Sequence, residues 1–245
     1  MIGRRSFVAL LSGAALSGCQ TTIGSGGLSL ASPILGGGGS RPLTDLEIGN
    51  GLKEALRIGT QRVVGQVGAV DGYNADPLIH IPLPEDLRKV HNVLDKVGLA
   101  SMTADLELKL NRSAERAAPE AKEVFWNAIT EMSLDDVRGI WQGPDDAATQ
   151  YFRGKMTLPL TDRFTPIVLD AMGEVGAIRS YDRMMSKYES IPFVPDVKAD
   201  LTRYTVKKGL SGLFTYVAKE EAAIRKDPAK RTTELLQRVF GALTS

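Results

Sequence analysis

Cysteine and histidine are scarce in this sequence. Its 245 residues include one cysteine, Cys19, and two histidines, His80 and His91. A single cysteine excludes an intrachain disulfide, and three such residues cannot build a conventional Cys/His zinc site. No stretch has the alternating Asp/Asn pattern of a calcium-binding loop, although a site built only from carboxylates stays open. The sequence therefore predicts no metal site and no cofactor.

An excess of charge of either sign is also missing. Lys plus Arg number 30 and Asp plus Glu number 29, so the formal net charge is +1. No basic stripe interleaved with aromatic residues is present, and this argues against nucleic acid as a partner. Period-2 alternation of apolar and polar residues, the pattern of half-buried strands, is scarce as well.

The N-terminus has the pattern of an export signal. Arg4 and Arg5 precede an apolar run at residues 7–16, which is too short to span a bilayer as a helix. The sequence "LSGC" then matches the bacterial lipobox, in which the cysteine thiol receives lipid and the chain is cut before it. We therefore expect residues 1–18 to be a lipoprotein signal peptide and Cys19 to be the lipidation site. The alternative is an ordinary signal peptide with a chance cysteine.

Two details of this segment concern the export route and the final location of the protein. "RRSFV" at residues 4–8 resembles the twin-arginine export signal, and the alternative is that its arginines are ordinary charges of a signal peptide. Gln20 occupies the position where aspartate often retains lipoproteins at the inner membrane. The resemblance therefore implies the periplasmic face of the outer membrane as the location.

Residues 19–43 are rich in glycine and serine without a repeat, which predicts a flexible tether. From residue 44 onward the signals are helical. Prolines interrupt them at residues 71–84, where we expect a long irregular loop. The prediction is a single all-α domain at 44–245, a bundle of eight to ten helices.

Several helix boundaries follow from local signals. Thr44 with Glu47 forms a capping box that opens a helix running to about Val67, and Ser133 in "SLDD" is the expected cap of a short helix. We expect further helices over residues 84–97 and 102–117, and others that begin at 119, at 144 and at a cap at Thr161. Another should lie around residues 181–188, the longest should cover 198–226, and the last should begin at a cap at Asp227.

The stretch "GPDDAATQYFR" at residues 143–153 is the most distinctive in the domain. Asp145 and Asp146 fall in the first turn of an expected helix, where carboxylates cap free N–H groups and complement the helix dipole. The functional alternative keeps one carboxylate as the cap and places the other, with Thr149, in a cleft as a base or cation ligand.

Two further groups complete the candidate polar site: Glu220, Glu221 and Arg225, and, one helical turn apart, Asn111 and Glu115. The i, i+4 spacing of Glu221 and Arg225 is that of a surface ion pair, and Asn111 with Glu115 is typical of a polar helix face. If Asn111, Asp146 and Glu220 were buried together, they would form a polar network that an aliphatic core does not need.

The sequence contains no recognised catalytic constellation. No serine in a nucleophile elbow is present to partner His80 or His91, because Ser211 lacks the spacing and lies within an expected helix. Tyrosines and methionines recur at helical spacing at residues 181–188. They are typical of core packing, with an apolar ligand pocket as the alternative.

Five segments carry a resemblance to a known family: "GLKEAL" from Gly51, "IHIPLP" from Ile79, "LNRSAE" from Leu110, "GPDDAATQYF" from Gly143 and "EEAAIRKDPAKRTTELLQRVFG" from Glu220. Together they span residues 48–241 and resemble an uncharacterised family of bacterial periplasmic lipoproteins, domain of unknown function 4197. The resemblance implies a location but no settled activity. Where this chain has His80, the family pattern usually has Arg or Lys, which weakens a catalytic role for that histidine.

These observations favour a lipid-anchored binding or protein-interaction module of the cell envelope. Its partner would be another envelope protein or an apolar ligand held between helices, in addition to the membrane that holds the anchor. The alternative is a carboxylate-dependent enzyme, a hydrolase or lyase acting through Asp145, Asp146 and Glu220. A third option is a purely structural role in the envelope.

Overall fold

A computed structural model describes residues 42–193 and 200–242 of the chain. The expected signal peptide, with Arg4 and Arg5, lies outside the described residues. So do Cys19 and the tether up to residue 41. From Pro42 onward the chain forms one compact unit.

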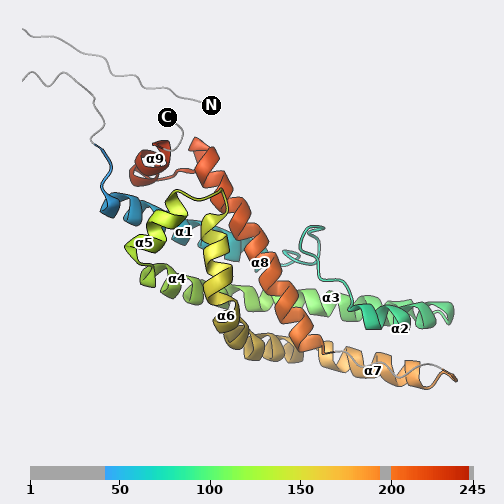
Figure 1. Ribbon diagram of the computed structural model, residues 1–245. Helices are drawn as coiled ribbons and strands as arrows, with labels where there is room; N and C mark the ends of the chain where they lie inside the picture. The colour runs from blue at the N-terminus through green and yellow to red at the C-terminus, as the bar shows by residue number, and fades with distance from the viewer. Residues whose placement is uncertain (1–41, 194–199, 243–245) are drawn as a thin grey trace, which may run out of the picture. The chain divides into compact units, whose positions relative to one another are not determined.

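The described residues form nine α-helices and two 3₁₀ turns, with no strand among them (Figure 1). This confirms the predicted all-α helical bundle. The helices are α1 (Asp45–Val67), α2 (Glu85–Lys96), α3 (Ala100–Ala117), α4 (Ala121–Glu131), α5 (Leu134–Trp141), α6 (Ala147–Glu174), α7 (Ala177–Glu189), α8 (Leu201–Lys226) and α9 (Glu234–Gly241).

Local capping signals fix several of these boundaries. The Thr44 hydroxyl accepts the backbone N–H of Glu47, while the Glu47 carboxylate accepts the N–H of Thr44 in return. Ser133 and Asp136 make the same reciprocal pair at the start of α5. Each pair satisfies two N–H groups that a helix start leaves without intrahelical acceptors. The capping box predicted at Thr44 and the cap predicted at Ser133 are therefore confirmed.

The prediction of two helices between residues 144 and 174 is wrong. α6 runs unbroken through Pro159 and Pro166, and at 28 residues it is longer than α8, which has 26. Thr161 does not cap a helix start, because its hydroxyl donates to the carbonyl of Thr157 one turn earlier. Each proline removes one hydrogen bond of the helix, and α6 changes direction part-way along its length (Figure 1).

The C-terminal helix also begins later than expected. The side chain of Asp227 accepts the N–H of Ala229 and caps a 3₁₀ turn, Pro228–Lys230, rather than an α-helix. Thr233 provides the side-chain cap of α9, through the N–H of Leu236. Proline at the first position suits either kind of turn, so the sequence signal marks a start without fixing its length.

α8 crosses the bundle and contacts α1, α3 and α6 (Figure 1). The ring of Phe125 lies edge-on to Phe152 of α6 and to Phe214 of α8, each at 5.8 Å between centroids. Met184, Met185 and Tyr188 are buried as well, so the interpretation of the Tyr/Met stretch as core packing holds for these residues. Phe214 also borders the groove between α6 and α8 that is described below.

Candidate functional site

The turn at Gly143 is held by a carboxylate from α8. Glu221 accepts the backbone N–H of Ala148 at 2.9 Å and that of Thr149 at 3.0 Å. The Thr149 hydroxyl donates to the same carboxylate at 2.9 Å. Glu221 therefore caps the N-terminus of α6 from another helix and complements its dipole.

Asp145 and Asp146 do not have the capping role that we expected. Asp146 occupies the N-cap position, but its side chain makes no cap hydrogen bond and instead accepts the side-chain amide of Gln150 at 2.8 Å. Its φ of −120° and ψ of 20° depart from the extended backbone from which an N-cap side chain reaches the helix. Asp145 forms an ion pair with Lys226.

Glu221 and Arg225 form a buried pair rather than the expected surface pair. Both side chains are 5% exposed, and an Arg225 nitrogen lies 3.2 Å from the carboxylate and 2.7 Å from the carbonyl of Ile140. Burial raises the pKa of Glu221, and the bonds from the α6 amides and the nearby guanidinium offset part of that rise. The three hydrogen bonds that Glu221 accepts from Ala148 and Thr149 hold α8 to α6, so the pair is a structural joint.

Asn111 and Glu115 anchor the irregular loop at residues 71–84 to α3. The Asn111 amide accepts the N–H of Ile81 and donates to its carbonyl, both at 2.8 Å. Glu115 accepts the N–H groups of Tyr73 and Asn74, at 3.1 and 3.0 Å. Both side chains are buried, so this polar face of α3 lies inside the molecule and not in solvent.

The histidines also have structural partners. His80 lies between the carbonyl oxygen of Asn74 and the carboxylate of Glu107, 2.9 Å from each. Nδ1 of His91 lies 2.7 Å from the hydroxyl of Thr103. Glu107 also accepts the N–H of Leu83, so His80 belongs to the same loop anchor as Asn111 and Glu115.

The structure does not gather Asn111, Asp146 and Glu220 into one network. Glu220 pairs with Arg62 of α1 at 2.6 Å, while Asn111 contacts the loop and Asp146 contacts Gln150. The pocket that Asp71, Ala75 and Asp76 of the loop line includes no residue of the turn at Gly143. The predicted polar residues therefore divide into separate structural clusters.

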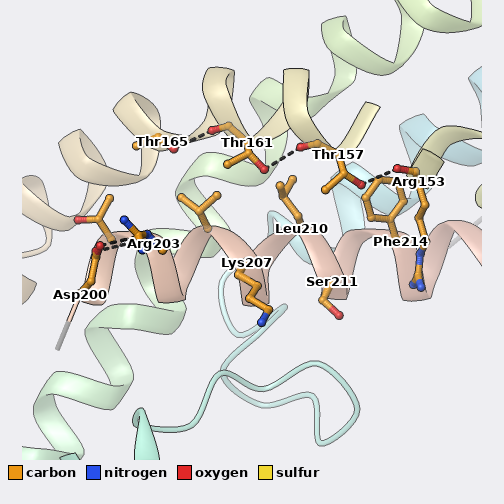
Figure 2. A pocket seen from close by; sticks show the side chains of 12 residues that line it. Arg153, Thr157, Thr161, Thr165, Asp200, Arg203, Lys207, Leu210, Ser211 and Phe214 are labelled. Atoms are coloured by element: carbon orange, nitrogen blue, oxygen red, sulfur yellow. Dashed lines mark hydrogen bonds and ion pairs between the residues drawn. The ribbon is translucent and has the colours of Figure 1, made fainter. Parts of the chain in front are cut away.

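A groove between α6 and α8 is the candidate site that the structure adds (Figure 2). Its volume is about 740 Å³, and α6 lines it with Arg153, Thr157, Thr161 and Thr165. The three threonine hydroxyls donate to the carbonyls one turn earlier, at 2.6 to 2.7 Å, as the dashed lines of Figure 2 show. Because those protons are already donated, Arg153 is the one of these four α6 side chains that still offers N–H donors to a ligand.

The α8 wall combines apolar and cationic side chains. Val206, Leu210 and Phe214 form its apolar surface. The Arg153 guanidinium lies 5.4 Å from the centre of the Phe214 ring, close enough for a cation–π contact. Lys207 and Arg203 also line the groove, the latter 3.3 Å from the carboxylate of Asp200. The groove can therefore cover an apolar ligand and place cations beside it.

Our sequence reasoning missed this groove. Thr157, Thr161 and Thr165 recur every four residues, a spacing that places them on one face of a helix. Our expectation that Thr161 capped a new helix hid that stripe. Val206, Leu210 and Phe214 show the same spacing, and we could not distinguish them from ordinary core residues by pattern.

Two further properties of the described residues concern metal binding and membrane crossing. Among residues 42–193 and 200–242, no group of three or more His, Cys, Asp or Glu side chains could hold a metal ion. Within those same residues, no helix combines the length and the apolar character that crossing a membrane requires.

The fold and the groove define an all-α, single-domain helical protein whose helices line a partly apolar cavity. A family model described as "Protein of unknown function (DUF4197)" matches residues 42–241, so the chain belongs to that family, as its motifs predicted. Neither the curated proteins nor the solved structures provide a match.

Proposed function

We propose that this protein is a lipid-anchored binding module of the bacterial cell envelope and that it holds an apolar ligand between α6 and α8. The observation that carries the proposal is the groove. Its volume of about 740 Å³ lies within the range of roughly 300–1,000 Å³ that small-molecule sites occupy. Its lining of apolar side chains with a few charged ones is also typical of such sites.

The location in this proposal comes from the N-terminal sequence. The lipobox at Cys19 and the signal peptide before it support a lipid anchor on the periplasmic side, and Gln20 supports the outer membrane. Two or more acyl chains hold a protein stably at a bilayer, whereas one chain binds marginally. The Gly/Ser tether at residues 19–43 would let the domain reach away from that surface.

No observation favours the carboxylate-dependent enzyme over this binding function. Asp145, Asp146 and Glu220 each contact a partner of their own, respectively Lys226, Gln150 and Arg62. None of these three carboxylates lines the groove.

A photoreactive fatty alcohol tests the binding function in membranes that contain the full-length lipidated protein. The alcohol carries an apolar chain and no charge, so its binding in the groove depends on the apolar lining and not on the cations beside it. We expect mass spectrometry to find crosslinked peptides from α6 and α8. Thr161→Trp should fill the groove and remove most of the labelling, because Thr161 lines its wall.

Thr215→Trp is the matched control. Thr215 lies on α8, donates to the Ser211 carbonyl in the same way as Thr161 does to Thr157, and does not line the groove. Labelling spread evenly over the chain, or labelling that both tryptophan variants leave unchanged, would refute the binding function.

A further inference from the structure

The shape and lining of the groove indicate the chemical class of its ligand. We propose that it takes a long-chain fatty acid, with the acyl chain along α6 and α8 and the carboxylate attracted by the positive charges of Arg153 and Lys207. This assignment rests on the proposed binding function and deepens it. Shape, hydrogen-bonding capacity and charge support it separately.

The shape of the groove suits one extended apolar chain. Its α6 wall runs from Arg153 to Thr165, a distance of about 18 Å at 1.5 Å per residue. A peptide helix is about 10 Å in diameter, much wider than a single acyl chain. A single acyl chain is slim enough to lie between the helices.

Hydrogen-bonding capacity argues against an extended peptide in this groove. A peptide backbone brings an N–H and a C=O at each residue, and leaving such groups without partners is costly. The hydroxyls of Thr157, Thr161 and Thr165 already donate within α6, so they can accept from a peptide N–H but offer no proton to a peptide carbonyl. Val206, Leu210 and Phe214 on the opposite wall offer only apolar side chains. An acyl chain needs no hydrogen bond along its length, so this lining suits it.

Charge argues for an acidic head group. The lining holds three cations, Arg153, Arg203 and Lys207, against one carboxylate, Asp200. Asp200 pairs with Arg203. Arg153 and Lys207 form no ion pair with any residue in 42–193 or 200–242. Two cations without an ion-pair partner among the described residues, beside an apolar channel, match a ligand with one apolar chain and one anionic end. A guanidinium can bind a carboxylate through two parallel hydrogen bonds.

The test compares two photoreactive probes of equal chain length, a fatty acid and the neutral fatty alcohol, on the full-length lipidated protein in membranes. Lys207→Glu and Arg153→Gln remove the unpaired cations. We expect each to reduce fatty-acid labelling of α6 and α8 about tenfold, the effect of losing one charge-assisted contact. Labelling by the alcohol should stay within about twofold. Lys207→Arg should retain fatty-acid labelling because it keeps the charge.

Lys208→Glu is the matched charge control. Lys208 is the next residue on α8, is exposed, and lies 5.8 Å from the Tyr204 ring rather than in the groove. The same charge reversal there should leave labelling by both probes unchanged. A loss equal to that of Lys207→Glu would mean that the membrane surface, and not the groove, senses the charge, and it would overturn the assignment.

The possible failures are distinguishable. If the alcohol labels the groove and the charge variants leave fatty-acid labelling unchanged, the fatty-acid assignment is wrong while the binding function stands. If neither probe labels α6 and α8, both proposals fail. Both probes could also be displaced by a two-chain anionic phospholipid or by an acidic amphipathic peptide, while free fatty acid displaces neither. That result would overturn the fatty-acid assignment and give the groove to that competitor.

Discussion

The carboxylate of Glu221 accepts both the backbone N–H and the hydroxyl of Thr149, across 72 residues of sequence. This contact ties the start of α6 to the C-terminal half of α8. The two helices that the contact joins are also the walls of the groove. The geometry of the candidate site therefore depends on a polar joint at one end of the helix pair.

Glu221→Gln should destabilise the protein strongly. It removes the charge that faces Arg225, which would remain buried and cationic, and breaking one side of a buried pair typically costs about 3–5 kcal/mol. Urea denaturation measures the free energy of unfolding. Glu220→Gln, at the neighbouring position, should cost about 1 kcal/mol or less because Arg62 is partly exposed. Equal losses for the two variants would contradict the buried joint.

The helical class and most helix starts could be predicted from the sequence, because they depend on local chemistry. Capping boxes at Thr44 and Ser133 use residues three positions apart, so a short window of sequence contains the whole signal. The helix start expected at Thr161 is absent for a related reason. Tertiary packing holds a helix through Pro159 and Pro166 that local preference alone would end.

The role of each polar residue could not be predicted, because it depends on partners distant in sequence. Asp146 stands where a cap is expected, yet the carboxylate that caps α6 comes from Glu221. The Asn111 partner is Ile81, 30 residues earlier, and no periodicity within α3 specifies that contact. The groove was missed for the same reason, since each of its walls resembles an ordinary helix face.

Asn111→Leu should release the loop at residues 71–84. The substitution roughly preserves volume but leaves the buried N–H and C=O of Ile81 without their partner, which costs about 3 kcal/mol. Hydrogen exchange should become faster at the Ile81 amide before it changes in α8. Asn127→Leu, at an exposed position of α4, is the control and should affect neither measurement. Unchanged exchange at Ile81 in Asn111→Leu would refute the anchoring role.

Gly212 in α8 is required by close packing against the loop. A Cβ there would lie 2.6 Å from a ring carbon of Tyr73, whose hydroxyl donates to the Gly209 carbonyl. Gly212→Ala should therefore lower the free energy of unfolding by about 1–3 kcal/mol. Gly65→Ala, in open space on α1, should raise it by about 0.5–1 kcal/mol because alanine favours helix. Thermal denaturation of both variants would test the contrast, and a stabilising Gly212→Ala would contradict it.

The contact between Tyr216 and Asp76 should make stability depend on pH at both extremes. The hydrogen bond from Tyr216 holds the pKa of Asp76 below its usual value, and the same bond raises the pKa of Tyr216. As pH falls below about 3.9, the unfolded carboxyl takes up its proton first, so the stabilisation is lost. As pH rises above about 10, the unfolded tyrosine loses its proton first, and stability falls again.

Tyr216→Phe isolates this contribution. The difference in unfolding free energy between wild type and Tyr216→Phe should be about 1 kcal/mol between pH 5 and 9, and it should shrink outside that window. Tyr204→Phe is the control at acid pH, because the Tyr204 hydroxyl donates to the Pro82 carbonyl and not to a carboxylate. A difference for Tyr216→Phe that stays constant down to pH 2.5 would show that Asp76 is not the acceptor.

Cys19→Ala should change where the protein is found without changing its fold. If the thiol carries lipid, the wild-type protein should remain with membranes after a high-salt wash, because buried acyl chains and not charges hold it there. Cys19→Ala removes the sulfur that forms the thioether, so its membrane-bound fraction should fall and the shift in mass of the acyl chains should disappear. Cys19→Ser is the matched control: serine keeps size and polarity but lacks the thiolate, so it should behave as alanine does. Wild-type protein in the soluble fraction, or the same distribution for all three proteins, would exclude the anchor while leaving the groove between α6 and α8 to be tested on its own.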